Sequence, residues 1–254
     1  MQAPREQIVS SGGEVNVDGG LLVGANAGSF GTILVGPGGS LGCGFLSLGD
    51  DGDGNMVIED GGEVCVNGLT FIAPAFDLVF QQDGGSLESG LGLQVAGRVF
   101  FFAGDSEITG DVEITGNGEL RVGPAAGSIG RVTGEIINNG SRTLVLANTT
   151  LFALGQVSGT SPFEGTGLIQ LNGGLSPGNG VGSIQFDCDA DFGTGAQIFM
   201  ELGGTVPGTQ HDQVRFNDVS LAGTLNVTTV NGFQPSPGQE LKSFSSNRVA
   251  AKHN

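Results

Sequence analysis

The chain has 254 residues, of which 49 are glycine and only 14% are charged, while the hydrophobic share is an ordinary 38%. The apolar share argues against global disorder, and the length suits one large domain or two small ones. Nine Lys and Arg against 26 Asp and Glu give a net charge of −17, so nucleic acid and anionic lipid headgroups are unfavourable partners. No run approaches the roughly 18 apolar residues that a spanning helix needs, so direct membrane insertion is not expected.

Four glycine-centred windows repeat along the first third of the chain. Each combines an apolar strand, a polar turn with a glycine pair, and a second short strand; the windows are residues 8–15, 34–41, 57–64 and 80–87. Weaker echoes follow at residues 114–120 and 136–141. Glycine pairs supply the positive φ angles that tight corners need, whereas glycine at this density would cost a helix up to ~1 kcal/mol per position.

A unit of about 23 residues cannot bury its apolar side alone, so it must stack on its neighbours as a solenoid. The repeat therefore predicts an all-β, right-handed parallel β-helix of roughly ten coils. We divide it into glycine-rich repeats at 1–164, a C-terminal β-helix block at 165–242 and an irregular tail at 243–254. An uncapped end would expose unpaired strand edges, so a cap formed by the last 40 residues is a further expectation.

Two features test strand alternation. In residues 186–192, apolar side chains alternate with Asp187, Asp189 and Asp191, which predicts a solvated outer face in preference to a calcium ladder. Cys43 and Cys65 are spaced like a disulfide between coils, but the repeat aligns Cys43 with the residue after Cys65. The two thiols are therefore expected on opposite faces of their strands.

The C-terminal third carries a specific motif. Residues 167–184 (GLIQLNGGLSPGNGVGSI) resemble the "LSPGN" signature of bacterial autotransporter passenger domains and of related PEP-CTERM-associated repeat surface proteins. Residues 201–214, 221–227 and 231–239 are similar to the continuation of that pattern. The N-terminal windows look like the repeat that often precedes it.

The resemblance implies a parallel β-helix that carries an export signal and is displayed at the cell surface or outer membrane, or secreted. Residues 1–7 lack the apolar core of such a signal peptide, which alone would indicate a cytoplasmic protein. After residue 242 neither a translocator barrel nor a sorting tail follows. The resemblance therefore implies that the chain is a fragment.

Three groups of residues are candidates for chemistry. Asp51, Asp53 and Asn55 have the spacing of the first half of a calcium loop, although Met56 stands where an EF-hand needs glycine. His211 and Asp212 suggest a base and its orienting group, but neighbours on an extended segment point in opposite directions. We expect no catalytic role for the pair, and calcium binding only as an alternative at the first group.

Arg98, Arg121 and Arg142 recur near one coil apart and could stack on one face of the solenoid. Arg142, however, is expected one position out of register with Arg121, and we see no cluster of aspartates beside them. A solvated face is the simpler interpretation. If the chain were a polysaccharide lyase or hydrolase, Arg98 and Arg121 would be its expected site residues.

The sequence thus favours a non-enzymatic, adhesin-like surface module without a cofactor, whose partners are surface glycans or proteins. A polysaccharide-acting β-helix enzyme and a calcium-stabilised repeat protein remain the alternatives.

Overall fold

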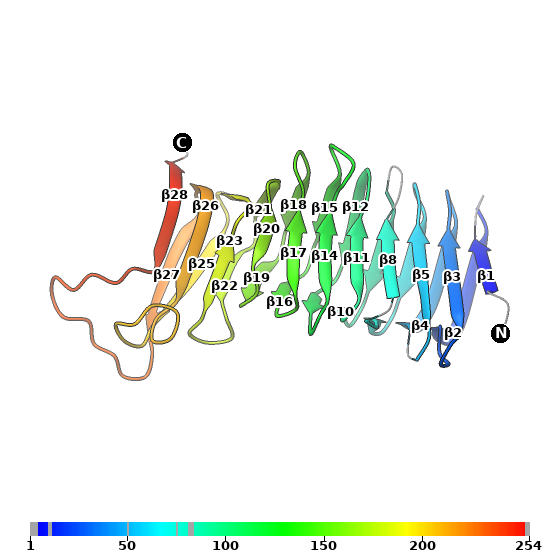
Figure 1. The fold of residues 1–254 in the computed structure, drawn as a ribbon, viewed down its shortest axis with the longest axis horizontal. Coiled ribbons are helices and arrows are strands. Elements are labelled where there is room, and N and C mark those ends of the chain that lie inside the picture. Colours follow the sequence, from blue (N-terminus) through cyan, green and yellow to red (C-terminus); the bar gives the residue numbers. More distant parts are fainter. Residues whose placement is uncertain (1–4, 10–11, 50, 75, 81–83, 252–254) are drawn as a thin grey trace.

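The computed structural model describes residues 5–9, 12–49, 51–74, 76–80 and 84–251. Its strands stack in parallel as an all-β solenoid of about nine turns, without a helix in the described part. Figure 1 shows an elongated rod in which the chain advances steadily from one end to the other. The predicted parallel β-helix is confirmed, with about nine turns against the ten expected.

The strands form three stacks, here named faces A, B and C in the order in which the chain visits them. Face A contains β1 (Arg5–Val9), β3 (Phe30–Val35), β5 (Asp53–Ile58), β8 (Phe76–Phe80), β11 (Arg98–Phe101), β14 (Glu119–Val122), β17 (Arg142–Val145), β20 (Phe163–Gly165) and β23 (Ser183–Phe186). Face B contains β6 (Glu63–Val66), β9 (Ser86–Ser89), β12 (Asp105–Thr109), β15 (Ile129–Val132), β18 (Thr150–Ala153), β21 (Leu168–Leu171) and β24 (Asp189–Phe192).

Face C contains β7 (Thr70–Ile72), β10 (Leu93–Val95), β13 (Val112–Ile114), β16 (Ile136–Asn138), β19 (Gln156–Gly159), β22 (Gly174–Pro177), β25 (Gln197–Leu202) and β27 (Thr224–Thr229). Four longer strands each span two faces. Of these, β2 (Glu14–Val23) and β4 (Ser40–Leu48) run from face B to face C, while β26 (Gln213–Leu221) and β28 (Phe244–Ala251) run from face A to face B.

The glycine pairs form the corner between faces A and B. In the third window, Gly61 has φ +65°, a conformation that favours glycine. A Cβ added at its neighbour Gly62 would lie 2.5 Å from the carbonyl oxygen of Val35 in the preceding coil. The first glycine therefore makes the turn, and the second allows the coils to approach each other.

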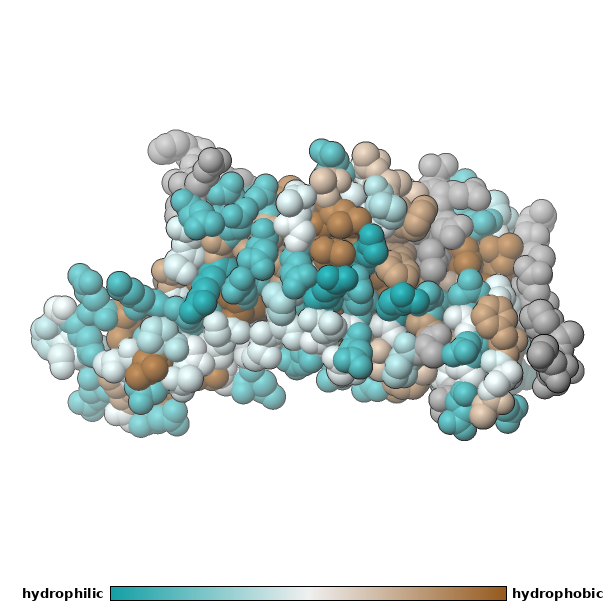
Figure 2. Space-filling view, viewed as in Figure 1, coloured by the Kyte–Doolittle hydropathy of each residue, from teal (hydrophilic) through white to brown (hydrophobic). Residues whose placement is uncertain are grey.

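Alternation along each strand divides its side chains between core and surface. In β11, Val99 and Phe101 are fully buried, while Arg98 and Phe100 face outward. The same alternation buries Cys188 and leaves Asp187 and Asp189 exposed. Figure 2 shows a face that is mostly hydrophilic, with separate apolar patches.

An aromatic column fills the core toward the C-terminal end. The rings of Phe163, Phe186 and Phe216 stack from coil to coil, with centroids 4.8 and 5.2 Å apart, and Phe244 lies 6.5 Å beyond Phe216. Because register partners repeat at each coil, one residue type can build a continuous stack along the axis.

The C-terminal part of the chain is organised differently from what the sequence predicts. Residues 244–251 form β28 in parallel register with β26, whereas we expected an irregular tail and a cap that folds back; Phe244 extends the aromatic column there. The expected boundary at residue 164 falls inside β20.

The two N-terminal cysteines lie on opposite sides of their strands, as expected. Cys43 pairs in register with Val66, and it is buried as a free thiol while Cys65 is exposed.

Candidate functional site

The three recurring arginines lie on the outward side of face A. Arg98 and Arg142 occupy one column of register partners, with Glu119 between them. Arg121 lies two residues further along its strand, in register with Phe100 and Leu144. The expectation of a shared face is therefore met, but Arg142 is two positions out of register with Arg121 instead of one.

Carboxylates alternate with these arginines, which the sequence analysis missed. Arg98 donates two hydrogen bonds to Asp77 of the preceding coil, at 2.7 and 2.8 Å. Arg142 lies 3.5 Å from Glu119 on one side and 3.4 Å from Glu164 on the other. A signal for these partners was present, because each acidic residue precedes or follows its arginine by about one coil, for example 21 residues for Asp77 and Arg98. We name Asp77, Arg98, Glu119 and Arg142 the charged column.

Arg121 is held differently from its neighbours. Its guanidinium lies 5.8 Å from the centre of the Phe100 ring, and that of Arg98 lies 5.5 Å from the same ring. The Nε atom of Arg121 is buried and has no hydrogen-bond partner within the described residues. The arrangement gives two cation–π contacts, each of about 0.5–1 kcal/mol at an exposed site.

Face B repeats this arrangement around Arg131, which the sequence analysis did not single out. Arg131 donates two hydrogen bonds to Asp105 of the preceding coil, at 2.7 and 2.8 Å, and its guanidinium lies 4.4 Å from the ring centre of Phe152 in the following coil. The hydrogen bonds to Asp105 raise the pKa of Arg131 above its usual range. Arginine thus binds neighbouring coils together on two faces.

We expect removal of Arg131 to destabilise the protein more than removal of Arg98. The side chain of Arg98 is 53% exposed, and that of Arg131 is 29% exposed. Arg98→Ala should lower the free energy of unfolding by up to about 1 kcal/mol, and Arg131→Ala by about 1–2 kcal/mol, since the Arg131 side chain is the more buried of the two and its contact with the Phe152 ring is closer than that of Arg98 with Phe100. Urea denaturation at low and high salt measures both losses; equal losses, or losses unaffected by salt, would contradict this assignment.

The calcium candidates lie where β5 begins. Asp51 precedes the strand, Asp53 is its first residue, and Asn55 faces outward as the register partner of Asp77. The Oδ1 atom of Asn55 is buried and has no hydrogen-bond partner in the described part of the chain. No three His, Cys, Asp or Glu side chains of the described residues gather closely enough to hold a metal ion.

His211 and Asp212 are both buried between β25 and β26. The Asp212 carboxylate accepts hydrogen bonds of 2.7 Å from the backbone N–H of Gly182 and from that of Glu201. Nδ1 of His211 lies 3.1 Å from the carbonyl oxygen of Gly204, and Nε2 has no partner among the described residues. The two side chains therefore bind backbone groups of β25 and of the segments at 182 and 204. Burial raises the pKa of Asp212, and its two backbone hydrogen bonds oppose that shift.

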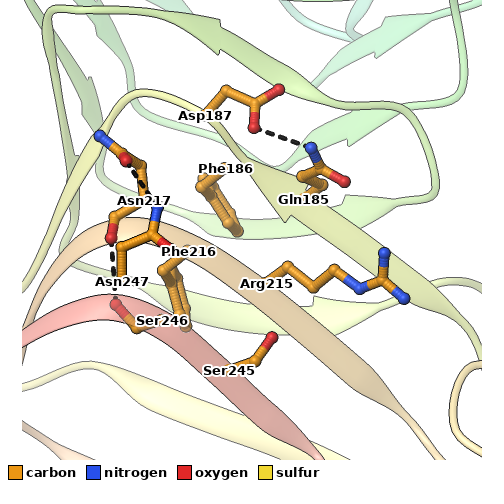
Figure 3. A pocket seen from close by; sticks show the side chains of 9 residues that line it. All are labelled: Gln185, Phe186, Asp187, Arg215, Phe216, Asn217, Ser245, Ser246 and Asn247. Atoms are coloured by element: carbon orange, nitrogen blue, oxygen red, sulfur yellow. Dashed lines mark hydrogen bonds between the residues drawn. The ribbon is translucent and has the colours of Figure 1, made fainter.

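A polar hollow of about 300 Å³ lies on face A near the C-terminal end (Figure 3). It is lined by Gln185, Phe186, Asp187, Arg215, Phe216, Asn217, Ser245, Ser246 and Asn247. Gln185 donates to Asp187 at 2.7 Å, and Asn247 donates to Asn217 at 3.1 Å. The hollow offers one guanidinium, one carboxylate and several amides, a set suited to neutral polar ligands.

No helix of the described residues is both long and apolar enough to cross a membrane. No family model, no curated protein and no solved structure matches this chain.

Proposed function

We propose that the chain is a non-enzymatic structural module that acts as a rigid, adhesin-like stalk at the cell surface. The observation that carries the proposal is that outward-facing arginines form ion pairs with carboxylates of adjacent coils. Arg98, Arg131 and Arg142 each pair with a carboxylate of an adjacent coil. A guanidinium held in this way strengthens the stacking of coils. Its charge is balanced by the paired carboxylate, so it attracts an acidic substrate less.

The core supports a role as a spacer. Each coil packs on its two neighbours, so a solenoid keeps its shape along its whole length without a central site. His211 and Asp212, the one histidine–carboxylate pair among the candidates, bind backbone groups of the segments around them. Both features favour mechanical support over chemistry.

The location outside the cell rests on the resemblance of residues 167–184 and 201–214 to autotransporter passengers and PEP-CTERM-associated proteins. On such a surface the partners would be glycans or proteins. Antibody labelling of intact cells that express the whole gene tests the location, and a protein reached only after lysis would contradict it.

One observation favours a polysaccharide-acting enzyme as the second candidate function. Arg121 leaves its Nε atom without a partner in the described part, and carboxylates of Asp77 and Glu119 lie in the neighbouring column on the same face. Cationic and acidic groups on one face are what cleavage of an acidic polysaccharide requires, because the guanidinium neutralises the substrate carboxylate.

We expect no turnover when the protein is incubated with pectin-type and alginate-type polymers and new unsaturated or reducing ends are measured. Turnover that Arg121→Ala abolishes, while far-UV circular dichroism and the melting temperature stay unchanged, would overturn the structural proposal. Leu91→Ala is the matched control, because this side chain is 76% exposed.

A further inference from the structure

A second hollow, of about 370 Å³, lies on the outward side of face C in the middle of the solenoid. Its floor is formed by register partners of four successive coils, Glu113 of β13, Ile137 of β16, Ser158 of β19 and Ser176 of β22. The floor therefore covers three spacings of about 4.8 Å, or roughly 14 Å along the axis. This volume and length suit a small elongated ligand.

A short loop walls this hollow at the corner between faces C and A. It joins β22 to β23, extends past the strands (Figure 1) and brings Asn179 to the hollow. The N–H of Gly178 donates to the carbonyl of Gly159 at 2.9 Å, and that of Gly182 donates to the Asp212 carboxylate at 2.7 Å. Because the loop is fixed on both sides, binding does not have to order it.

Amide side chains around the hollow have hydrogen-bonding groups that the protein does not use. Within the described residues, the amides of Asn139, Gln156 and Asn179 make no hydrogen bond. In the hollow of Figure 3, by contrast, Gln185 and Asn247 already donate to neighbouring side chains. The hollow on face C is thus the better prepared to bind a polar ligand, because its amides have no partner to give up.

The charge of the hollow also differs from that of faces A and B. Glu113 and Glu135 line it, and none of the described lysines and arginines does. Neither carboxylate forms an ion pair in the described part of the chain, whereas Arg98 on face A and Arg131 on face B each pair with an aspartate. Glu135 accepts a hydrogen bond of 2.8 Å from Ser158, which orients it. An anionic ligand would therefore be repelled.

We infer that this hollow binds a short stretch of neutral saccharide, which lies along the axis of the solenoid. The inference rests on the proposed function, under which glycans are one class of partner, and it names the site and the kind of glycan. Sugar hydroxyls donate to Glu113 and Glu135 and accept from the unpaired amides, while Ile137 contacts the C–H groups of a ring. The two carboxylates exclude glycans that carry carboxylate or sulfate groups.

Isothermal titration calorimetry of the whole chain with soluble oligosaccharides tests the inference. The neutral probes are cello-, xylo-, manno- and N-acetylchito-oligosaccharides, and the acidic probe is an oligogalacturonate. We expect at least one neutral probe to bind and the acidic probe not to bind. Asn139→Ala and Gln156→Ala should each weaken binding about two- to tenfold, since each removes a hydrogen bond to the sugar.

Gln170→Ala is the matched control, because Gln170 is an outward, half-buried glutamine like Gln156 but lies in β21 on face B. It should bind the neutral probe as the wild type does. Replacing both carboxylates, Glu113→Gln together with Glu135→Gln, should let oligogalacturonate bind, because the repulsion is gone. Far-UV circular dichroism checks the fold of each variant, and Asn179→Ala in the loop repeats the test if a strand variant does not fold.

Failure of every neutral probe to bind, or binding that the alanine variants of the hollow leave unchanged, would overturn the inference. Binding of tetralysine in place of the saccharides would overturn it too, since the site would then select cations. The surface location is decided separately by antibody labelling. New reducing ends released from a bound neutral probe would support the saccharide site and overturn the non-enzymatic function.

Discussion

Replacing Phe186 with alanine is expected to lower the free energy of unfolding by roughly 3–5 kcal/mol. The ring is fully buried between Phe163 and Phe216, at centroid distances of 4.8 and 5.2 Å. Its removal loses two stacking contacts and leaves a cavity that the neighbouring coils cannot fill, because hydrogen-bonded strand pairing holds their backbones in register. Denaturation in urea, followed by circular dichroism, measures the loss.

Phe199 provides the matched control, since its side chain is 42% exposed on the same half of the solenoid. Phe199→Ala should cost less than about 1 kcal/mol. Because coils interact only with their neighbours, Phe186→Ala should open the C-terminal coils first, and amide hydrogen exchange should show β23 and β26 less protected than β11. Equal losses for the two variants would show that the aromatic column does not stabilise the rod.

The second large effect is expected at Asp212. Asp212→Ala leaves the buried N–H groups of Gly182 and Glu201 without their acceptor, at a cost of about 1–3 kcal/mol each. Asp212→Asn keeps one oxygen and should lose less. The melting temperatures of both variants, compared with that of Asp189→Ala at an exposed position of β24, measure these costs.

The same carboxylate should make stability depend on pH. Burial raises its pKa in the folded protein above the usual value of about 3.8, so the folded state binds a proton more readily than the unfolded state. The stability of the wild type relative to Asp212→Asn should therefore be highest below about pH 3.8 and should decline as pH rises through the folded pKa. Urea midpoints of both proteins from about pH 3.5 to 7.5 test the sign, and a relative stability that rises with pH would contradict it.

The corner glycines explain why the fold could be predicted from sequence. Gly38 and Gly61 lie at the same place in successive coils, and both have positive φ. Their neighbours Gly39 and Gly62 have no room for a Cβ, so the glycine pair in each window predicts both the turn and the close contact between coils. The weaker echoes at 114–120 and 136–141 lie instead at the corner between faces C and A, where they join β13 to β14 and β16 to β17.

The charged column could be predicted only in part. Spacing alone placed Arg98, Arg121 and Arg142 on one face, because coils of 21 and 23 residues set which residues are neighbours there. It did not identify Asp77 or Glu119 as their partners, since pairing depends on a register that varies by one or two residues from coil to coil. The hydrogen bonds of Asp212 could not be predicted from the sequence for a related reason. They join backbone groups 30 and 11 residues away, and neither separation follows the repeat.

The direction of the hydrogen bonds between coils has a mechanical consequence. They lie along the axis of the rod, so a force that pulls its two ends apart loads one layer of bonds after another in series. A layer that yields frees one coil of about 22 residues, which extends by roughly 70 Å before the tension rises again and another layer yields. The rod would thus lengthen in discrete steps under tension, while the coils that remain keep their stacking and their shape.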